Sequence, residues 1–366
     1  MGEIMKSIFI ILGNGFTIDF LTHYNKYNVN NPTKQHSIDV TNLMMNGEKI
    51  ITPWDKKPGF LSYKNCPALW TLGARPYQSS SESISLIEEI ISCANMFFDF
   101  IHDKEQQKQR IAMRSEIDGK IYLKAYCELV TYIQQLFSYY NSKIDDGDLD
   151  DFLNNYNGWG WKEFLNRKRL DKYEEIVFVT YKYDIWLERM LKQQKLPFSI
   201  VGFKGKEERI KIIKPHGSIS FVPQHYEAPM QMKYNLDIEG GQKLESLEVK
   251  YDDLLSYMDG AIIPPTGDST RLETSTSWAK SLRKEAIAAA KNISKSDAND
   301  VVLCGISYWY VDRHEIDELL INLNHKANLI FINPHPPRDL NAVLSSIFQN
   351  YVLQTSSDNI GGLLNG

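Results

Sequence analysis

The sequence predicts an α/β protein whose core is a doubly wound, mostly parallel sheet with a helical insertion. Three observations indicate this class. Short runs that are apolar on both faces recur along the chain, as expected for buried parallel strands. Most of these runs end in glycine, proline or small polar residues. Segments with helical spacing of apolar residues separate several of them, and this alternation is typical of parallel sheets.

The first element is a predicted central strand at 7–12, which consists of Ser-Ile-Phe-Ile-Ile-Leu. Gly13, Asn14 and Gly15 follow it directly and lead into a helical pattern. A strand that ends in glycines before a helix is the usual start of a nucleotide-binding unit. The full GxGxxG pattern is absent because position 18 is Ile. A tight turn without a ligand therefore explains these glycines about equally well.

The next part of the chain changes from loops to helices. We expect 22–81 to be rich in loops, with short helices, because no sustained period is present. Apolar residues recur at helical spacing from 82 to about 140, and we expect Ser81 to cap the first helix. The aspartate-rich run 145–151 predicts a solvated acidic turn.

These patterns predict how the chain is divided. We expect 82–170 to form a helical insertion into a single α/β domain. Residues 1–81 would supply the first part of that domain, and 171–366 the remainder. The glycine-rich tail 360–366 is expected to be disordered.

The second half of the chain supplies most of the sheet. Further strands are predicted at 175–180, 198–203, 210–214, 261–265, 301–305 and 328–333. Helices are predicted at 184–195, 277–293, 312–325 and 340–351. Asp184 would cap the helix that begins there. The complete pattern is Rossmann-like, with strands and helices alternating.

Composition excludes several classes of function. Lys plus Arg is 41 and Asp plus Glu is 46, so the net charge of −5 provides no global basic field for nucleic acid. The apolar run 8–12 is too short to cross a membrane or to form a signal sequence. The 4 cysteines form no CxxC pair, so we predict no metal site and a reducing, cytoplasmic location.

Polar residues follow several of the predicted strands. His216 and Gly217 come after the strand 210–214, and Thr180-Tyr-Lys-Tyr-Asp184 comes after the strand 175–180. Open α/β sheets bind ligands at the carboxyl ends of their strands. A neutral imidazole there suits the activation of a hydroxyl or a water, although a structural histidine in a turn is about equally compatible.

The order of these motifs resembles the sirtuin-like NAD-binding fold. It looks more like the sirtuin-like effector domains of bacterial anti-phage systems, which hydrolyse NAD. The resemblance implies that the catalytic histidine is His216. It implies phosphate contacts from Gly13, Asn14, Gly15 and Phe16, and contacts on the adenosine side from Gly305, Ser307 and Asn333. Asp19, Thr180 and Gly217 complete the expected binding residues, and Asp184 joins the expected catalytic group.

Two departures from the family pattern matter. The zinc module of protein-deacetylating sirtuins is absent, which argues against deacetylation. The family usually has Thr-x-Asn-Tyr-Asp before the catalytic histidine, so Lys182 occupies the position of the expected catalytic Asn. Three explanations compete: an inactivating change, a naturally modified or dead pocket, or a shifted loop in which Lys182 points to solvent.

The resemblance implies an NAD glycohydrolase that releases nicotinamide and ADP-ribose as an effector in anti-phage defence. NAD would be its substrate, with no resident cofactor. A regulatory protein partner or a homo-oligomer is expected, because such activity must stay off until infection. The alternative is a catalytically silent nucleotide-sensing or scaffold subunit with the same fold, and Lys182 favours this alternative.

Overall fold

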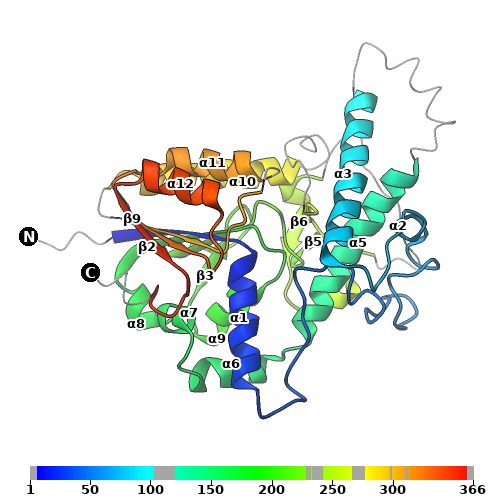
Figure 1. Cartoon of the computed structure of the whole chain (residues 1–366), viewed down its shortest axis with the longest axis horizontal. Coiled ribbons are helices and arrows are strands. Elements are labelled where there is room, and N and C mark those ends of the chain that lie inside the picture. The colour runs from blue at the N-terminus through cyan, green and yellow to red at the C-terminus, as the bar shows by residue number, and fades with distance from the viewer. Residues whose placement is uncertain are drawn as a thin grey trace, which may run out of the picture. The chain divides into compact units, whose positions relative to one another are not determined.

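The computed structural model describes residues 6–102, 120–227, 232, 242–265, 277–296, 299–309 and 312–360. The chain divides into two compact units (Figure 1). The first unit comprises Met1–Ile38, Asn141–Pro215 and Ser281–Gly366. The second comprises Asp39–Tyr140 and His216–Lys280. The helices of the expected insertion 82–170 are thus shared between the units, because 82–140 belongs to the second and 141–170 to the first.

The first unit is built on a 7-stranded sheet whose order is β3-β4-β2-β1-β7-β8-β9. Each neighbouring pair of strands is parallel. The strands are β1 (Lys6–Leu12), β2 (Tyr173–Thr180), β3 (Phe198–Ile200), β4 (Ile210–Ile213), β7 (Asp300–Cys304), β8 (Asn328–Ile332) and β9 (Asn350–Gln354). This sheet confirms the predicted Rossmann-like α/β class.

Strand order places a topological switch point beside β1. The chain adds β2, β4 and β3 on one side of β1, and β7, β8 and β9 on the other. Leu12 is in register with Thr180 of β2 and with Cys304 of β7, so the carboxyl ends of these three strands are level. In open α/β sheets this edge is where ligands bind.

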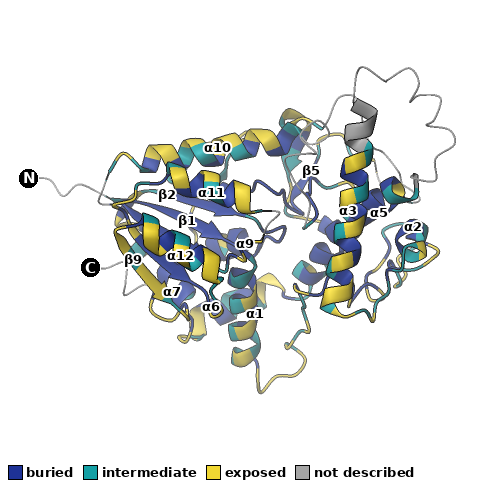
Figure 2. Cartoon of the chain, turned by 45° about the horizontal axis from the view of Figure 1, so that its top comes forward, coloured by how far each residue is buried: buried dark blue, intermediate teal, exposed yellow. Residues whose placement is uncertain are grey.

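Helices cover both faces of the sheet. The helices α10, α11 and α12 lie over one face, and α1, α7 and α9 lie on the opposite one (Figure 1). The helices of this unit are α1 (Asn14–Tyr27), α6 (Asp146–Asn155), α7 (Gly160–Phe164), α8 (Arg167–Leu170), α9 (Trp186–Gln193), α11 (Arg313–Asn322), α12 (Arg338–Ile347) and most of α10 (Ser277–Ile293). Figure 2 shows the central strands buried and the outer helix faces exposed, which explains the two-sided apolar runs.

The second unit is mainly helical. It contains α2 (Pro67–Thr71), α3 (Ser80–His102), most of α5 (Lys120–Ser142) and an antiparallel pair formed by β5 (Phe221–Pro223) and β6 (Leu247–Val249). The buried Glu128 carboxylate of α5 accepts hydrogen bonds from the Ala68 and Leu69 amides, at 3.1 and 2.8 Å. These contacts fix the short helix α2, because its first amides have no partners within the helix.

The structure differs from the prediction at one expected strand and at the end of the last helix. Residues 261–265 form no strand of the sheet, and Ile262 makes only an isolated antiparallel bridge to Gly217. Pro264 and Pro265 have no amide hydrogen, so this segment cannot sustain a ladder. The helix predicted over 340–351 ends at Ile347, and the short edge strand β9 follows. An edge strand of 5 residues with partly exposed side chains has little hydrophobic periodicity to reveal it.

Two helix starts also differ from the prediction. The acidic run begins the helix α6, whose Asp145 side chain accepts from the Asp148 amide at 2.7 Å. Aspartates suit a helix start because they satisfy its amides and oppose its dipole. Ser79 caps α3 in place of Ser81: its hydroxyl accepts from the Glu82 amide at 3.3 Å, while the Glu82 carboxylate accepts from the Ser79 amide at 2.9 Å.

Within the described ranges, no helix combines the length and the apolar character needed to cross a membrane. The predicted disordered tail lies outside the described residues, apart from Ile360.

Candidate functional site

The turns that follow β1 and β7 touch each other through three glycines. The Gly13 amide donates to the Cys304 carbonyl at 2.9 Å, and the Gly15 amide donates to the Gly305 carbonyl at 3.2 Å. A Cβ atom added to Gly15 would lie 2.4 Å from the Gly305 Cα atom. Gly305 itself has φ +62°, where side chains are disfavoured. Glycine is therefore required at this contact for the packing of one turn on the other.

This contact changes the interpretation of the glycine motif. The sequence left two explanations open, a nucleotide-binding loop and a tight turn without a ligand. The structure gives Gly13, Gly15 and Gly305 a packing role. Because the Gly13 and Gly15 amides already donate to carbonyl groups, they are engaged within the protein in this conformation. An anion at this edge would need other donors.

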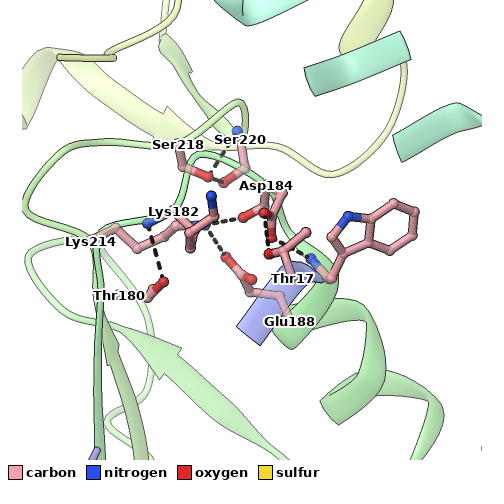
Figure 3. A network of polar contacts seen from close by, with 9 residues as sticks. Thr17, Thr180, Lys182, Asp184, Glu188, Lys214, Ser218 and Ser220 are labelled. Atoms are coloured by element: carbon pink, nitrogen blue, oxygen red, sulfur yellow. Dashed lines mark hydrogen bonds and ion pairs between the residues drawn. The ribbon is translucent and has the colours of Figure 1, made fainter. Parts of the chain in front are cut away.

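Lys182, which follows β2, is buried at the same edge of the sheet. Lys182 is 7% exposed, and its amine donates to the side-chain oxygen of Asn14 on α1. The Lys182 amide lies 3.3 Å from the Thr180 hydroxyl (Figure 3). Burial lowers the pKa of Lys182 to about 8; nearby Asp184 opposes this shift and nearby Lys214 adds to it. A shifted loop with Lys182 in solvent is therefore not what the structure contains.

Asp184 links the turn after β2 to helix α1. Its carboxylate accepts from the Thr17 hydroxyl at 2.7 Å, and its backbone carbonyl accepts from the Lys214 amine at 2.6 Å (Figure 3). The cap of α9 is Ile185, with no side-chain hydrogen bond. The other Asp184 carboxylate oxygen, Oδ1, accepts from the amide of Trp186, the first residue of α9, at 3.4 Å. The predicted role of Asp184 at the start of this helix is therefore partly confirmed, although the cap position itself is Ile185.

A buried ion pair beside this group joins Lys214, which directly follows β4, to Glu188 of α9. The Lys214 amine lies 2.8 Å from the Glu188 carboxylate, and the two side chains are 0% and 1% exposed. The second Glu188 oxygen, Oε2, has no hydrogen-bond partner among the described residues. Figure 3 shows how Lys214 and Glu188 join Asp184 and Thr17 in one polar network. We define the Lys182 cluster as Asn14, Thr17, Lys182, Asp184, Glu188 and Lys214.

Phe16 and Asp19 have structural partners on the other side of α1. Phe16 is 2% exposed and packs edge-on against Trp161, with ring centroids 5.2 Å apart. The Asp19 carboxylate accepts from Trp159 Nε1 at 2.7 Å and from the Ser357 hydroxyl at 2.6 Å. Burial raises the pKa of Asp19, but the hydrogen bonds from His23, Ser357 and Trp159 outweigh it, so the pKa is lowered overall. These contacts bury Phe16 in the aromatic core of the unit and hold the partly exposed Asp19 carboxylate against Trp159.

Ser307 and Asn333 follow β7 and β8 at the same edge. The Asn333 side chain donates to the Ile306 carbonyl at 3.1 Å and accepts from the His335 amide at 3.0 Å. Asn333 therefore ties the two turns together. Ser307 is exposed.

His216 belongs to the second unit, in which its segment is held by 261–263. The His216 carbonyl accepts from the Ile263 amide at 3.0 Å, and the Ser218 amide donates to the Ala261 carbonyl at 3.1 Å. Gly217 has φ +83°, and an added Cβ atom would lie 1.8 Å from the Ala261 oxygen. His216 is 5% exposed and is therefore buried.

Sequence reasoning missed Thr17, Glu188 and Lys214. A signal was present for Lys214, since a lysine that directly follows the buried run 210–213 needs a partner. Glu188 stands four residues after Asp184 and so approaches the same strand end. Within the described ranges, no three His, Cys, Asp or Glu side chains form a group that could hold a metal ion.

No family model matches the chain, and no curated protein sequence matches it. A solved structure described as the structural basis for the mechanism and regulation of Sir2 enzymes is similar to it, with 10% identity and a TM-score of 0.31. The match covers 99% of this chain and 92% of that one. The fold class rests on the strand order, and the candidate site rests on the Lys182 cluster.

Proposed function

We propose that this chain is a sirtuin-like NAD glycohydrolase that acts as an effector in anti-phage defence. The observation that supports it is the meeting of the turns after β1 and β7 at the switch point, with the Lys182 cluster on the neighbouring strand ends. Dinucleotides bind at this position in doubly wound sheets. NAD would be the substrate, and the products would be nicotinamide and ADP-ribose.

Roles are proposed for the polar residues of this edge and, separately, for His216 of the second unit. Asn14 and Thr180 would contact the nicotinamide ribose and the phosphates, while Ser307 and Asn333 would contact the adenosine side. His216 would act as general base toward the attacking water, or would position the ribose. Breaking the bond between nicotinamide and ribose develops positive charge on the sugar, so a neutral or negative environment favours the reaction.

Lys182 supports a second candidate function. A charged ammonium about 4 Å from the developing cation would raise the barrier by roughly 4 kcal/mol at an effective dielectric constant of about 20. Because Lys182 is buried at the candidate edge, a catalytically silent nucleotide-sensing or scaffold subunit is the alternative. Both candidates require the nucleotide to bind.

The test is nicotinamide release from NAD by the purified full chain, with His216→Ala as the critical variant. The exposed His314 of α11 provides the control variant His314→Ala. We expect release by the wild type and His314→Ala, and its loss in His216→Ala. Release that His216→Ala leaves unchanged would refute the role of His216.

Thermal stability separates the two candidates. If NAD and ADP-ribose stabilise the chain but neither the wild type nor Lys182→Asn releases nicotinamide, the silent subunit is supported. If neither ligand raises the melting temperature and no nicotinamide is released, both candidates fail. If the chain is an anti-phage effector, the NAD concentration should also fall on phage infection in bacteria that produce the wild type. In bacteria that produce His216→Ala, the NAD concentration should stay unchanged.

A further inference from the structure

The sheet of the first unit ends in an edge strand that lacks the usual protection against pairing. Among the described residues, β9 pairs with β8 alone, so the other side of its backbone has no strand beside it. Natural proteins protect such edges with charged residues, proline or bulges. β9 has the sequence Asn-Tyr-Val-Leu-Gln, without a charge or a proline, and its register with β8 is regular. The edge is therefore chemically suited to receive another strand.

Apolar side chains are exposed on both faces of β9. Val352 is 40% exposed and Leu353 is 36% exposed, and successive residues of a strand point to opposite faces of the sheet. The Tyr351 hydroxyl donates to the side chain of Asn341 on α12, so Tyr351 and Leu353 lie on the face that α12 covers (Figure 1). Val352 lies on the opposite face. A docked helix would cover one face only, whereas an added strand covers both, so the exposure indicates a strand.

The surroundings of β9 are neutral as well. Residues 340–357, which include β9 and most of α12, form the longest run of the sequence without a charged side chain, although charged residues make up 24% of the chain. Depletion of charge is typical of the buried centre of a protein interface. A second copy of the chain would bring the same neutral edge, so no like charges would meet.

The hydrogen bonds to β8 determine which backbone groups of β9 face outward. The Asn333 amide donates to the Gln354 carbonyl at 2.9 Å, so Gln354 is one of the residues that face β8. In a parallel pair, alternate residues of a strand bond to the same neighbour. Tyr351 and Leu353 therefore present their amides and carbonyls to the open side, where an antiparallel strand would bond to both.

We propose that β9 is a homodimerisation edge, at which two copies of the chain pair antiparallel about a twofold axis through Val352. Tyr351 then lies opposite Leu353 of the second copy in a hydrogen-bonded pair, and Val352 lies opposite its own counterpart. Asn350 lies opposite Gln354, so apolar side chains meet apolar ones and amides meet amides. Moving the axis to Tyr351 or Leu353 would set Val352 opposite an amide side chain. The strand is thus complementary to itself in one register, as a twofold interface requires.

The first measurement is sedimentation velocity of the purified full chain over a wide range of concentrations. Val352→Lys sets two ammonium groups opposite each other at the axis, and like charges in this position oppose pairing. Ile321→Lys is the matched control, because it places the same charge on an exposed apolar position of α11. We expect a dimer for the wild type and Ile321→Lys, and a dissociation constant larger by roughly tenfold or more for Val352→Lys.

The second measurement tests the register by oxidative cross-linking. At the axis, the two Val352 Cα atoms would be about 4.5 Å apart, which is within the range for a disulfide. We expect Val352→Cys to form a covalent dimer. The control is Thr355→Cys, because the two Thr355 positions would lie about 20 Å apart along the paired strands. The wild type measures any background from its own cysteines, of which Cys66, Cys127 and Cys304 are buried and Cys93 is half-buried.

Three results would overturn the proposal. A wild type that is monomeric at every concentration would leave the edge to another occupant, such as a strand of a different protein. A dimer that Val352→Lys leaves unchanged would lie elsewhere on the chain. Equal cross-linking of Val352→Cys and Thr355→Cys would exclude the register. If Val352→Lys does not fold, the cysteine variants decide the question. The outcome is independent of NAD cleavage, because neither measurement involves a nucleotide.

Discussion

The Lys214 amine lies 2.8 Å from the Glu188 carboxylate, and this ion pair is almost completely buried. The same amine donates to the Asp184 carbonyl at 2.6 Å, so one lysine joins β4, α9 and the turn after β2. A charge in this position is tolerated only while its partner remains, because removal of either member leaves an uncompensated buried charge. The pair therefore holds the edge of the sheet on which Lys182 lies.

Glu188→Gln should destabilise the protein by about 3–5 kcal/mol, since it removes the negative charge but keeps the shape. Urea unfolding measures the loss. Glu208→Gln is the control, because Glu208 pairs at 3.1 Å with Lys206, whose side chain is 84% exposed. The loss of unfolding free energy in Glu208→Gln should stay below about 1 kcal/mol. Equal losses for the two variants would show that the buried pair has no special role.

Gly305→Ala tests the contact between the turns after β1 and β7. The added methyl group would lie 2.2 Å from the Gly15 Cα atom, so the two turns must separate. We expect a loss on the order of 4 kcal/mol in unfolding free energy, within the range of severe substitutions. Gly59→Ala isolates backbone strain, because Gly59 has φ +101° and nothing within 4 Å of an added Cβ. Its cost should be about 1–2 kcal/mol.

The sequence predicted the sheet well because its strands are buried on both faces. The runs 7–12 and 328–333 are apolar over most of their length, which is typical of a strand that is buried on both faces. Both form strands in the structure. Prediction failed where the local pattern was ambiguous. The edge strand β9 has partly exposed side chains, and the two prolines after Ile263 end a run that otherwise looks like a strand.

The candidate site was predictable only in part. Strand ends indicated Asn14, Lys182 and Asp184, which the structure brings together with Thr17 and Lys214. The partners of a buried charge depend on which strand ends become neighbours, and β2 and β4 are separated by about 30 residues. The packing of Gly305 against Gly15 could not be predicted from the sequence either, because it depends on β1 lying beside β7.

The first turn of α3 offers a local test of helix capping. Ser79→Ala removes the hydroxyl that the Glu82 amide and carboxylate contact, and it should cost about 1 kcal/mol. Ser81→Ala is the matched control, because Ser81 lies inside the helix. Thermal unfolding of both variants measures the difference. A larger loss of stability for Ser81→Ala would show that Ser81 caps the helix, as the sequence predicted.

Protonation of Lys182 should make stability depend on pH. Its pKa is about 8 in the folded protein, through burial and nearby Lys214, against the opposing effect of Asp184. An unfolded lysine has a pKa of about 10.4. Between these values the unfolded chain binds more protons, so stability rises with pH, by about 3 kcal/mol in all. Unfolding free energies of the wild type and Lys182→Met at pH 7 and pH 10 test this. The advantage of the methionine variant should shrink at the higher pH; a constant difference would contradict the lowered pKa.

The same titration predicts how Lys182→Asn changes NAD cleavage. At pH 7 most Lys182 amines are charged and oppose the positive charge that develops on the ribose. Removing a repulsion of about 4 kcal/mol would raise the rate up to about a thousandfold. Above pH 8 the wild-type amine is largely neutral, so the gain should fall well below that value.

The measurement is nicotinamide release at pH 7 and pH 9, for the wild type, Lys182→Asn and Lys206→Asn. The last variant removes an exposed lysine from the same unit and should match the wild type at both values. A gain for Lys182→Asn that is as large at pH 9 as at pH 7 would mean that the amide group itself, and not the loss of charge, restores the reaction. A gain confined to the lower pH would identify the ammonium charge of Lys182 as the inhibitory feature.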